Sequence, residues 1–100
     1  MTTKFLVIGL PASFTSEQLQ QLLAGEAGDL QTAEMLPDTI ATGVGYVKMA
    51  NMYAMRRAVR RFASMSMEHI LGVRPLICGD DSVTFLALSK RWETERVATV

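Results

Sequence analysis

Cysteine and histidine are scarce in this sequence of 100 residues, which contains one of each, Cys78 and His69. A single cysteine cannot form an internal disulfide, and a structural metal site needs several Cys or His ligands. No general base or second ligand is spaced to activate either side chain. The sequence therefore predicts no disulfide framework, no metal site and no cofactor.

Long hydrophobic runs are also lacking. The apolar stretches around residues 5–8 and 85–88 fall far short of the roughly 20 residues that span a bilayer. The first residues lead directly into a strand-like segment, without the apolar region and cleavage site of a signal peptide. We therefore expect a cytoplasmic protein that has no membrane partner.

Catalytic motifs are missing as well. The sequence contains no phosphate-binding loop of the GxxxxGK[ST] type, no nucleophile elbow and no pair of carboxylates placed for acid–base chemistry. The sequence therefore predicts that the protein is not an enzyme.

An excess of charge of one sign is absent overall, because ten basic residues balance ten acidic residues. The strongly basic pI that is typical of nucleic-acid-binding domains is therefore missing. The charges are nevertheless unevenly distributed, since residues 1–40 carry one lysine against five acidic residues, whereas residues 41–79 carry six basic residues against Glu68. Four basic residues fall on one side of a predicted helix: Arg56, Arg57, Arg60 and Arg61. This side of the helix is predicted to be solvated or to meet the acidic first helix or an acidic partner, and a nucleic-acid-binding patch is the alternative.

Apolar residues make up 49% of the chain, which is enough for the packed core of one domain. Four segments are rich in β-branched, aromatic or other apolar residues and lie next to turn-forming residues, as strands do. These segments are residues 4–11, 30–36, 43–49 and 75–78.

Two helices are predicted between these strands. A capping box formed by Thr15 and Gln18 precedes apolar residues at helical spacing, which indicates a helix over about residues 16–25. Asn51 can cap a second helix, in which apolar residues recur at helical spacing from Met55 onward. The order β-α-β-β-α-β predicts an α+β sandwich, in which a four-stranded antiparallel sheet carries two helices on one face.

Residues 80–100 are predicted to extend beyond this domain, which is expected to occupy residues 1–79. Asp81 or Ser82 can cap a third helix in the extension. Its apolar residues recur at helical spacing: Phe85, Leu88 and Trp92. Residues 83–86 also have strand chemistry, so a strand is the alternative. We favour a helix that packs on the sheet, because the following residues are rich in helix formers.

Two strand motifs resemble those of the RNA recognition motif family. Residues 5–10 read FLVIGL and resemble the family's first-strand hexamer, which is aliphatic, aromatic, aliphatic, any, Asn or Gly, and Leu, with agreement at its last four positions. Residues 42–49 read TGVGYVKM and match the third-strand octamer at its two glycines, its second aromatic and its final position. The resemblance covers about three quarters of the chain. It implies a ferredoxin-like fold that binds single-stranded RNA on its sheet.

The stacking positions of these motifs depart from the family pattern. The family stacks RNA bases on aromatic rings at three positions, which here are Leu6, Val44 and Tyr46. One ring of three is therefore retained, and Thr42 replaces the basic residue that opens the octamer. These departures predict weak or poorly selective RNA binding.

Alternation of side chains along the strands predicts an apolar patch on the outer face of the sheet. The patch comprises Leu6, Ile8, Val44, Tyr46 and Ile77, whereas Leu76 and Cys78 are expected to point toward the helices. A contiguous apolar patch of this kind is rarely left in water by a monomer. We expect it to be covered by single-stranded RNA, by the chain's own extension, or by another protein or a second copy.

The resemblance implies a set of RNA contacts on this patch. Tyr46 would stack on a base, and three aliphatic side chains would add apolar contacts: Leu6, Ile8 and Val44. Lys4 and Lys48 would contact the RNA backbone, and Arg74 would add a contact from the loop before the last strand. The alternative is a protein–protein interaction module or a homodimer that uses the same patch or the arginine-rich helix. Phe85, Leu88 and Trp92 are the expected cover of the sheet or interface residues.

Overall fold

The computed structural model describes residues 3–26 and 28–98 and confirms the α+β fold. Its described strands form one antiparallel sheet in the order β2-β3-β1-β4. Their bounds are Lys4–Ile8 for β1, Leu30–Met35 for β2, Val44–Met49 for β3 and Leu76–Gly79 for β4. The two strands that carry the family motifs, β1 and β3, are therefore neighbours at the centre of the sheet.

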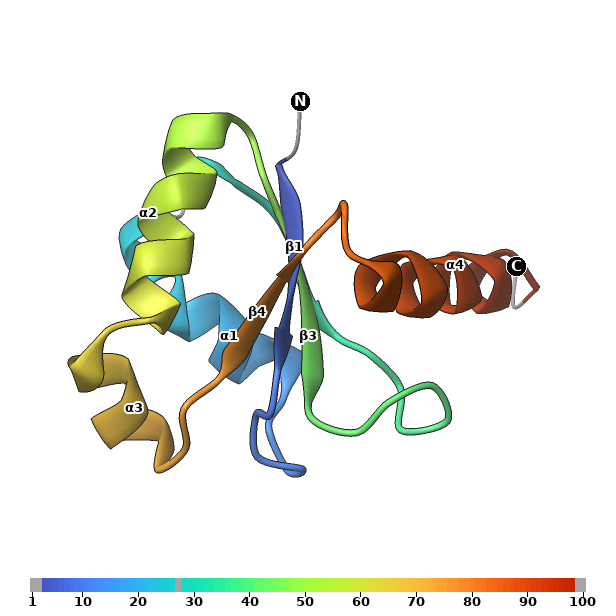
Figure 1. Cartoon of the computed structure of the whole chain (residues 1–100), viewed down its shortest axis with the longest axis horizontal. Helices are drawn as coiled ribbons and strands as arrows, with labels where there is room; N and C mark the ends of the chain where they lie inside the picture. The colour runs from blue at the N-terminus through green and yellow to red at the C-terminus, as the bar shows by residue number, and fades with distance from the viewer. Residues whose placement is uncertain (1–2, 27, 99–100) are drawn as a thin grey trace.

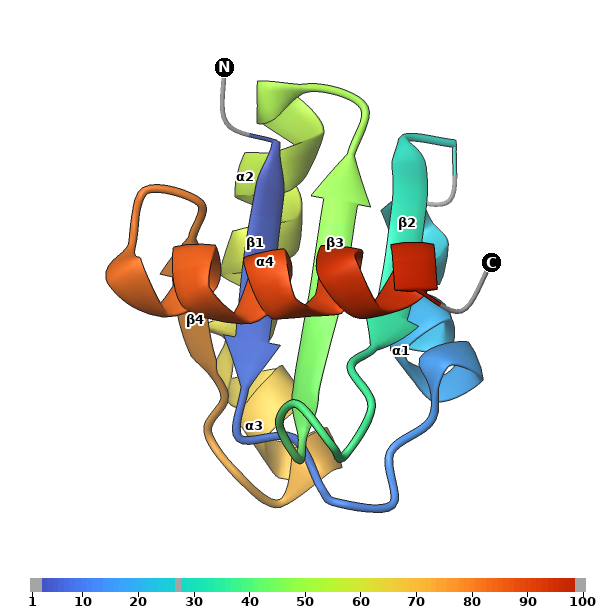
Figure 2. The same ribbon diagram turned by 90° about the vertical axis from the view of Figure 1, so that its right-hand side faces the viewer.

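Helices lie on both sides of this sheet. Figure 1 shows α1, α2 and α3 on one side and α4 alone on the other. Their bounds are Ser16–Leu22 for α1, Met52–Phe62 for α2, Met65–Leu71 for α3 and Val83–Ala98 for α4. Seen from the right-hand side of Figure 1, α4 runs across the strands from β4 toward β2 (Figure 2). The protein therefore has three layers, with the sheet in the middle.

Local sequence signals explain where the first two helices begin. The Thr15 hydroxyl accepts a hydrogen bond from the Gln18 amide, and the Gln18 side chain accepts one from the Thr15 amide. The Asn51 side chain accepts a hydrogen bond from the Ala54 amide at 2.9 Å and caps α2. The capping box and the Asn51 cap predicted from the sequence are therefore both present.

The helices differ from the expectation in two places. The helix expected over residues 16–25 ends at Leu22 and is followed by a short 3-10 helix, η1, over Ala24–Glu26. The sequence analysis assigned no helix between α2 and β4, but α3 occupies Met65–Leu71. Ser64 caps its start, and Gly72 ends it with a φ of 73°, a left-handed conformation that favours glycine.

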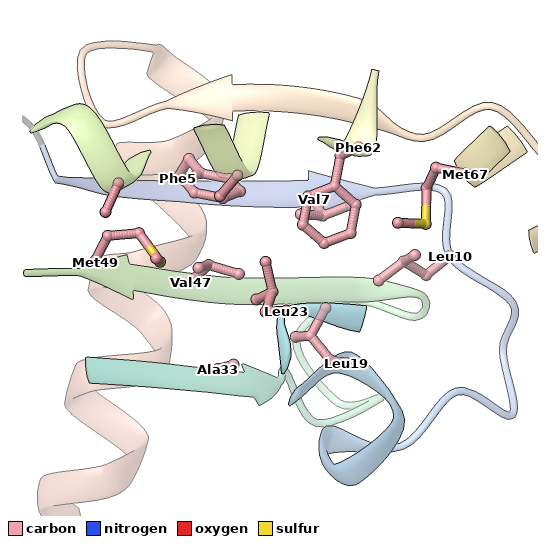
Figure 3. Packing of buried hydrophobic residues seen from close by; sticks show 12 residues of the cluster. Phe5, Val7, Leu10, Leu19, Leu23, Ala33, Val47, Met49, Phe62 and Met67 are labelled. Atoms are coloured by element: carbon pink, nitrogen blue, oxygen red, sulfur yellow. The ribbon is translucent and has the colours of Figure 1, made fainter. Parts of the chain in front are cut away.

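The main core lies between the sheet and the helices α1 and α2 (Figure 3). Its largest fully buried side chains include Phe5 from β1 and Phe62 from α2, whose ring centroids lie 6.2 Å apart in an edge-to-face arrangement. Val7 and Val47 join them from the same face of the sheet. These residues alternate with Leu6 and Tyr46, which therefore point to the opposite face.

Gly43 shows why the second position of the octamer motif is a glycine. Its φ is 71°, and its backbone approaches that of Leu10 so closely that a Cβ atom would collide with the Leu10 carbonyl oxygen. The Leu10 amide donates a 2.9 Å hydrogen bond to the Gly43 carbonyl. The end of β1 and the start of β3 are thus fixed against each other, which sets the register of the two motif strands.

Candidate nucleic-acid interface

The face of the sheet turned away from α1 and α2 is covered by α4. A second apolar cluster, here called the α4 cluster, fills the space between them. Its buried members are Leu6, Leu36, Ile40, Val44, Tyr46, Phe85 and Trp92. The three motif residues expected on the outer face therefore do lie there, but α4 separates them from solvent.

Tyr46 lies at the centre of the α4 cluster. Its ring centroid lies 4.6 Å from that of Trp92 and 6.1 Å from that of Phe85, both on α4. Only 5% of Tyr46 is exposed. The ring that would stack on a base therefore already packs against an aromatic side chain of the same protein.

The sequence of α4 explains which side faces the sheet. The Ser82 hydroxyl accepts a hydrogen bond from the Phe85 amide at 3.1 Å and caps the helix. Phe85, Ser89 and Trp92 then follow at helical spacing and are all buried. Leu86 lies on another side of α4 and is 57% exposed. One face of α4 thus covers the sheet, while other side chains of the helix, such as Leu86 and Lys90, are exposed.

The loop between β2 and β3 is also part of this cover, which the sequence analysis missed. Leu36 and Ile40 from this loop are buried in the α4 cluster. The Arg91 guanidinium of α4 donates a 3.1 Å hydrogen bond to the Thr39 carbonyl. The large apolar side chains of Leu36 and Ile40 were the available signal, and they contribute to the binding of α4 to the sheet.

The side-chain directions expected for β4 are wrong by one residue. Cys78 is the register partner of Leu6 and packs against the α4 cluster, whereas Ile77 packs against the main core. Leu76 shares the face of Cys78 and is 63% exposed. Since alternation has a period of two, a shift of one position exchanges the two faces. Cys78 therefore replaces Ile77 in the outer patch.

The three basic residues expected to contact RNA fall into two places. Lys4 and Lys48 are register partners on β1 and β3, and both are half-buried beside the α4 cluster. Arg74 lies in the loop between α3 and β4, where its Nε is 3.6 Å from a carboxylate oxygen of Glu68. The two lysines thus flank the covered face, whereas Arg74 forms an exposed ion pair with α3. Ile8 and Leu88 are half-buried at the edge of the α4 cluster.

Neither a metal site nor a membrane segment was found within residues 3–26 and 28–98. No three side chains of the Cys, His, Asp or Glu type come together there in a way that could hold a metal ion. None of the helices in this part of the chain is long and apolar enough to cross a membrane.

Comparison with known proteins gave one finding. The family described as RNA recognition motif matches residues 6–69, which is more than half of the chain and runs from within β1 to within α3. The match ends before β4 and α4. No curated protein sequence and no solved structure matches the chain significantly.

Proposed function

This chain belongs to the RNA recognition motif family, which supports an RNA-binding role in general, and we propose that it binds single-stranded RNA on the outer face of its sheet without catalysing a reaction. The observation that carries the proposal is the shared orientation of Leu6, Val44 and Tyr46. These side chains occupy the stacking positions of the two family motifs and lie together on neighbouring strands, on the face opposite α1 and α2.

RNA can reach this face only after α4 has moved away, because Tyr46 is buried beneath Trp92. Re-exposing the side chains of Phe85 and Trp92 costs roughly 1.5–3 kcal/mol each. A closed state favoured by roughly 3–6 kcal/mol would lower the apparent RNA affinity by roughly 10²–10⁴-fold. The helix α4 would thus act as a cover that limits RNA binding.

Once the face is open, the contacts are few. Tyr46 would stack on one base, which is worth about 1–3 kcal/mol, while Leu6 and Val44 add apolar contact. Lys4 and Lys48 lie next to each other at one end of this face and would meet the phosphate backbone. With so few phosphates contacted, RNA affinity should fall only shallowly as salt is raised.

The competing proposal is that a protein partner or a second copy binds the same apolar face. This alternative meets the same obstacle as RNA binding, because α4 already fills that face with Phe85 and Trp92. A protein partner would have to displace α4 in the same way as RNA. The experiment below therefore distinguishes the two.

The test compares two substitutions on different sides of α4. Trp92→Ala removes the anchor over Tyr46, whereas Leu86→Ala removes an exposed side chain of the same helix. We expect Trp92→Ala to bind a short mixed-sequence single-stranded RNA at least about tenfold more tightly than the native chain, because its closed state is weakened. Leu86→Ala should bind like the native chain. Amide chemical-shift titration and fluorescence anisotropy would measure both.

Adding Tyr46→Ala to the Trp92→Ala variant should remove most of the gained RNA affinity. The proposal fails if the Trp92→Ala variant stays folded and does not bind RNA, or if RNA affinity does not depend on Tyr46. A dimer formed by the Trp92→Ala variant in the absence of RNA binding would instead support the protein-interaction alternative.

A further inference from the structure

The exposed side of α2 is strongly positive. This helix lies on the side of the sheet opposite α4 (Figure 1). Its eleven residues include four arginines and no acidic residue. Tyr53, Arg56 and Arg60 follow at i, i+3 and i+7 and therefore share one side of the helix. Tyr53 is 74% exposed, which is unusual for a large aromatic side chain. Tyrosine and arginine are also the residue types that dominate binding energy at protein interfaces.

A groove with an apolar floor runs along this face. It has a volume of 320 Å³ and is lined by Met55, Arg56, Val59 and Arg60. Met55 and Val59 form one i, i+4 row that packs partly against the main core, and Arg56 and Arg60 form the parallel row on the solvent side. The groove thus has aliphatic side chains along one row and guanidinium groups along the other.

The arginines of α2 differ in their partners. Arg57 pairs with Asp29, with 3.2 Å between Nη2 and Oδ2, and so links α2 to the segment before β2. Among the described residues, no such ion pair is formed by Arg56 or Arg60, although both are exposed. The charge beside the groove is therefore available to an external partner.

We propose that this groove binds an acidic peptide segment of a partner protein, which inserts an apolar side chain between Met55 and Val59. Carboxylates on either side of that side chain would form charge-assisted hydrogen bonds with Arg56 and Arg60. The groove favours a peptide over RNA, because none of its lining side chains is an aromatic ring on which a base could stack. The proposal does not depend on RNA binding at the sheet, because α4 and α2 lie in different layers.

A set of labelled probes tests this proposal on the full chain. The main probe is a short helical peptide with leucines at i and i+4 and glutamates at the other positions. A second peptide replaces the glutamates by glutamines, a third contains glutamate alone, and a fourth probe is a short mixed-sequence single-stranded RNA. We expect the main probe to bind most tightly in fluorescence anisotropy, since it supplies both the carboxylates and the apolar side chain.

Matched variants locate the binding site. Arg60→Ala should weaken binding of the main peptide by roughly tenfold, and Arg56→Ala/Arg60→Ala by more, because each removes a charge-assisted contact. Lys90→Ala removes one exposed positive charge from α4 and should leave peptide affinity unchanged. Thermal unfolding of each variant checks that the fold is retained.

Two results would overturn the proposal. The first is that net charge alone is recognised. This would be seen if Lys90→Ala and Arg60→Ala weakened peptide binding equally, or if the glutamate-only peptide bound as tightly as the main peptide. The other is a native chain that binds none of the peptides but binds RNA, together with loss of that RNA binding in the Arg56→Ala/Arg60→Ala variant, which would make this face a nucleic-acid surface.

Discussion

The two faces of the sheet pack against different kinds of partner. The main core joins the sheet to α1 and α2, and its buried residues are drawn from β1 to α3. The α4 cluster joins the other face to a terminal helix and to the loop between β2 and β3. The family match, over residues 6–69, ends before α4. We expect that the main core maintains the fold and that α4 can leave the sheet without unfolding it.

Phe62→Ala should produce the largest loss of stability. Phe62 is fully buried and packs edge-to-face on Phe5, so its removal leaves a large cavity in the main core. We expect the free energy of unfolding to fall by about 3–5 kcal/mol, measured by urea denaturation. If this variant unfolds at nearly the same urea concentration as the native chain, the main core does not maintain the fold in the way expected here.

Trp92→Ala should lower the stability less than Phe62→Ala does, although tryptophan is the larger side chain. Its cost cannot exceed the free energy that holds α4 on the sheet, because beyond that point α4 detaches while the main core stays folded. We expect a loss of roughly 1.5–3 kcal/mol in α4, measured by native-state hydrogen exchange. Amides of β1 and β3 that bond within the sheet should keep most of their protection. Equal loss of protection in the sheet and in α4 would show that they unfold as one unit.

Ser82→Ala should weaken α4 by a smaller amount. The substitution removes the hydroxyl that accepts a hydrogen bond from the Phe85 amide, and loss of such a cap costs about 0.5–2 kcal/mol. Hydrogen exchange should therefore speed up in α4 and remain unchanged in α2. Asn51→Ala serves as the matched control, since it removes the cap of α2 and should have the reverse pattern.

Arg57→Ala should have the smallest effect. Its ion pair with Asp29 is largely exposed, and such pairs contribute about 0–1 kcal/mol. Urea denaturation should detect little change in the free energy of unfolding, and less at high salt. A loss comparable to that of Phe62→Ala would mean that the charged face of α2 is part of the fold and not a surface available to a partner.

The sequence allowed the order of strands and helices to be predicted because local signals agreed with the fold. The capping box at Thr15, the cap at Asn51 and the alternation along β1 and β3 all depend on near neighbours in the chain. The helix α3 was missed, although Ser64 and Gly72 are standard start and stop signals, because seven residues are too short a segment to reveal a helical period.

The candidate site was harder to predict because it depends on contacts distant in sequence. Leu36 and Ile40 join the α4 cluster only because the loop between β2 and β3 folds under α4, which local patterns cannot reveal. The direction of Cys78 follows from its pairing with Leu6, and a four-residue strand gives too short a pattern to fix it.

The most direct test of the account is the fluorescence of Trp92 during RNA titration. Trp92 is the single tryptophan of the chain and lies buried against Tyr46, so its emission reports whether α4 covers the sheet. If RNA binds the face beneath α4, the emission of Trp92 should shift to longer wavelength as its side chain enters water. RNA binding with unchanged Trp92 emission would contradict the account, because the RNA would then occupy another surface while α4 stays in place.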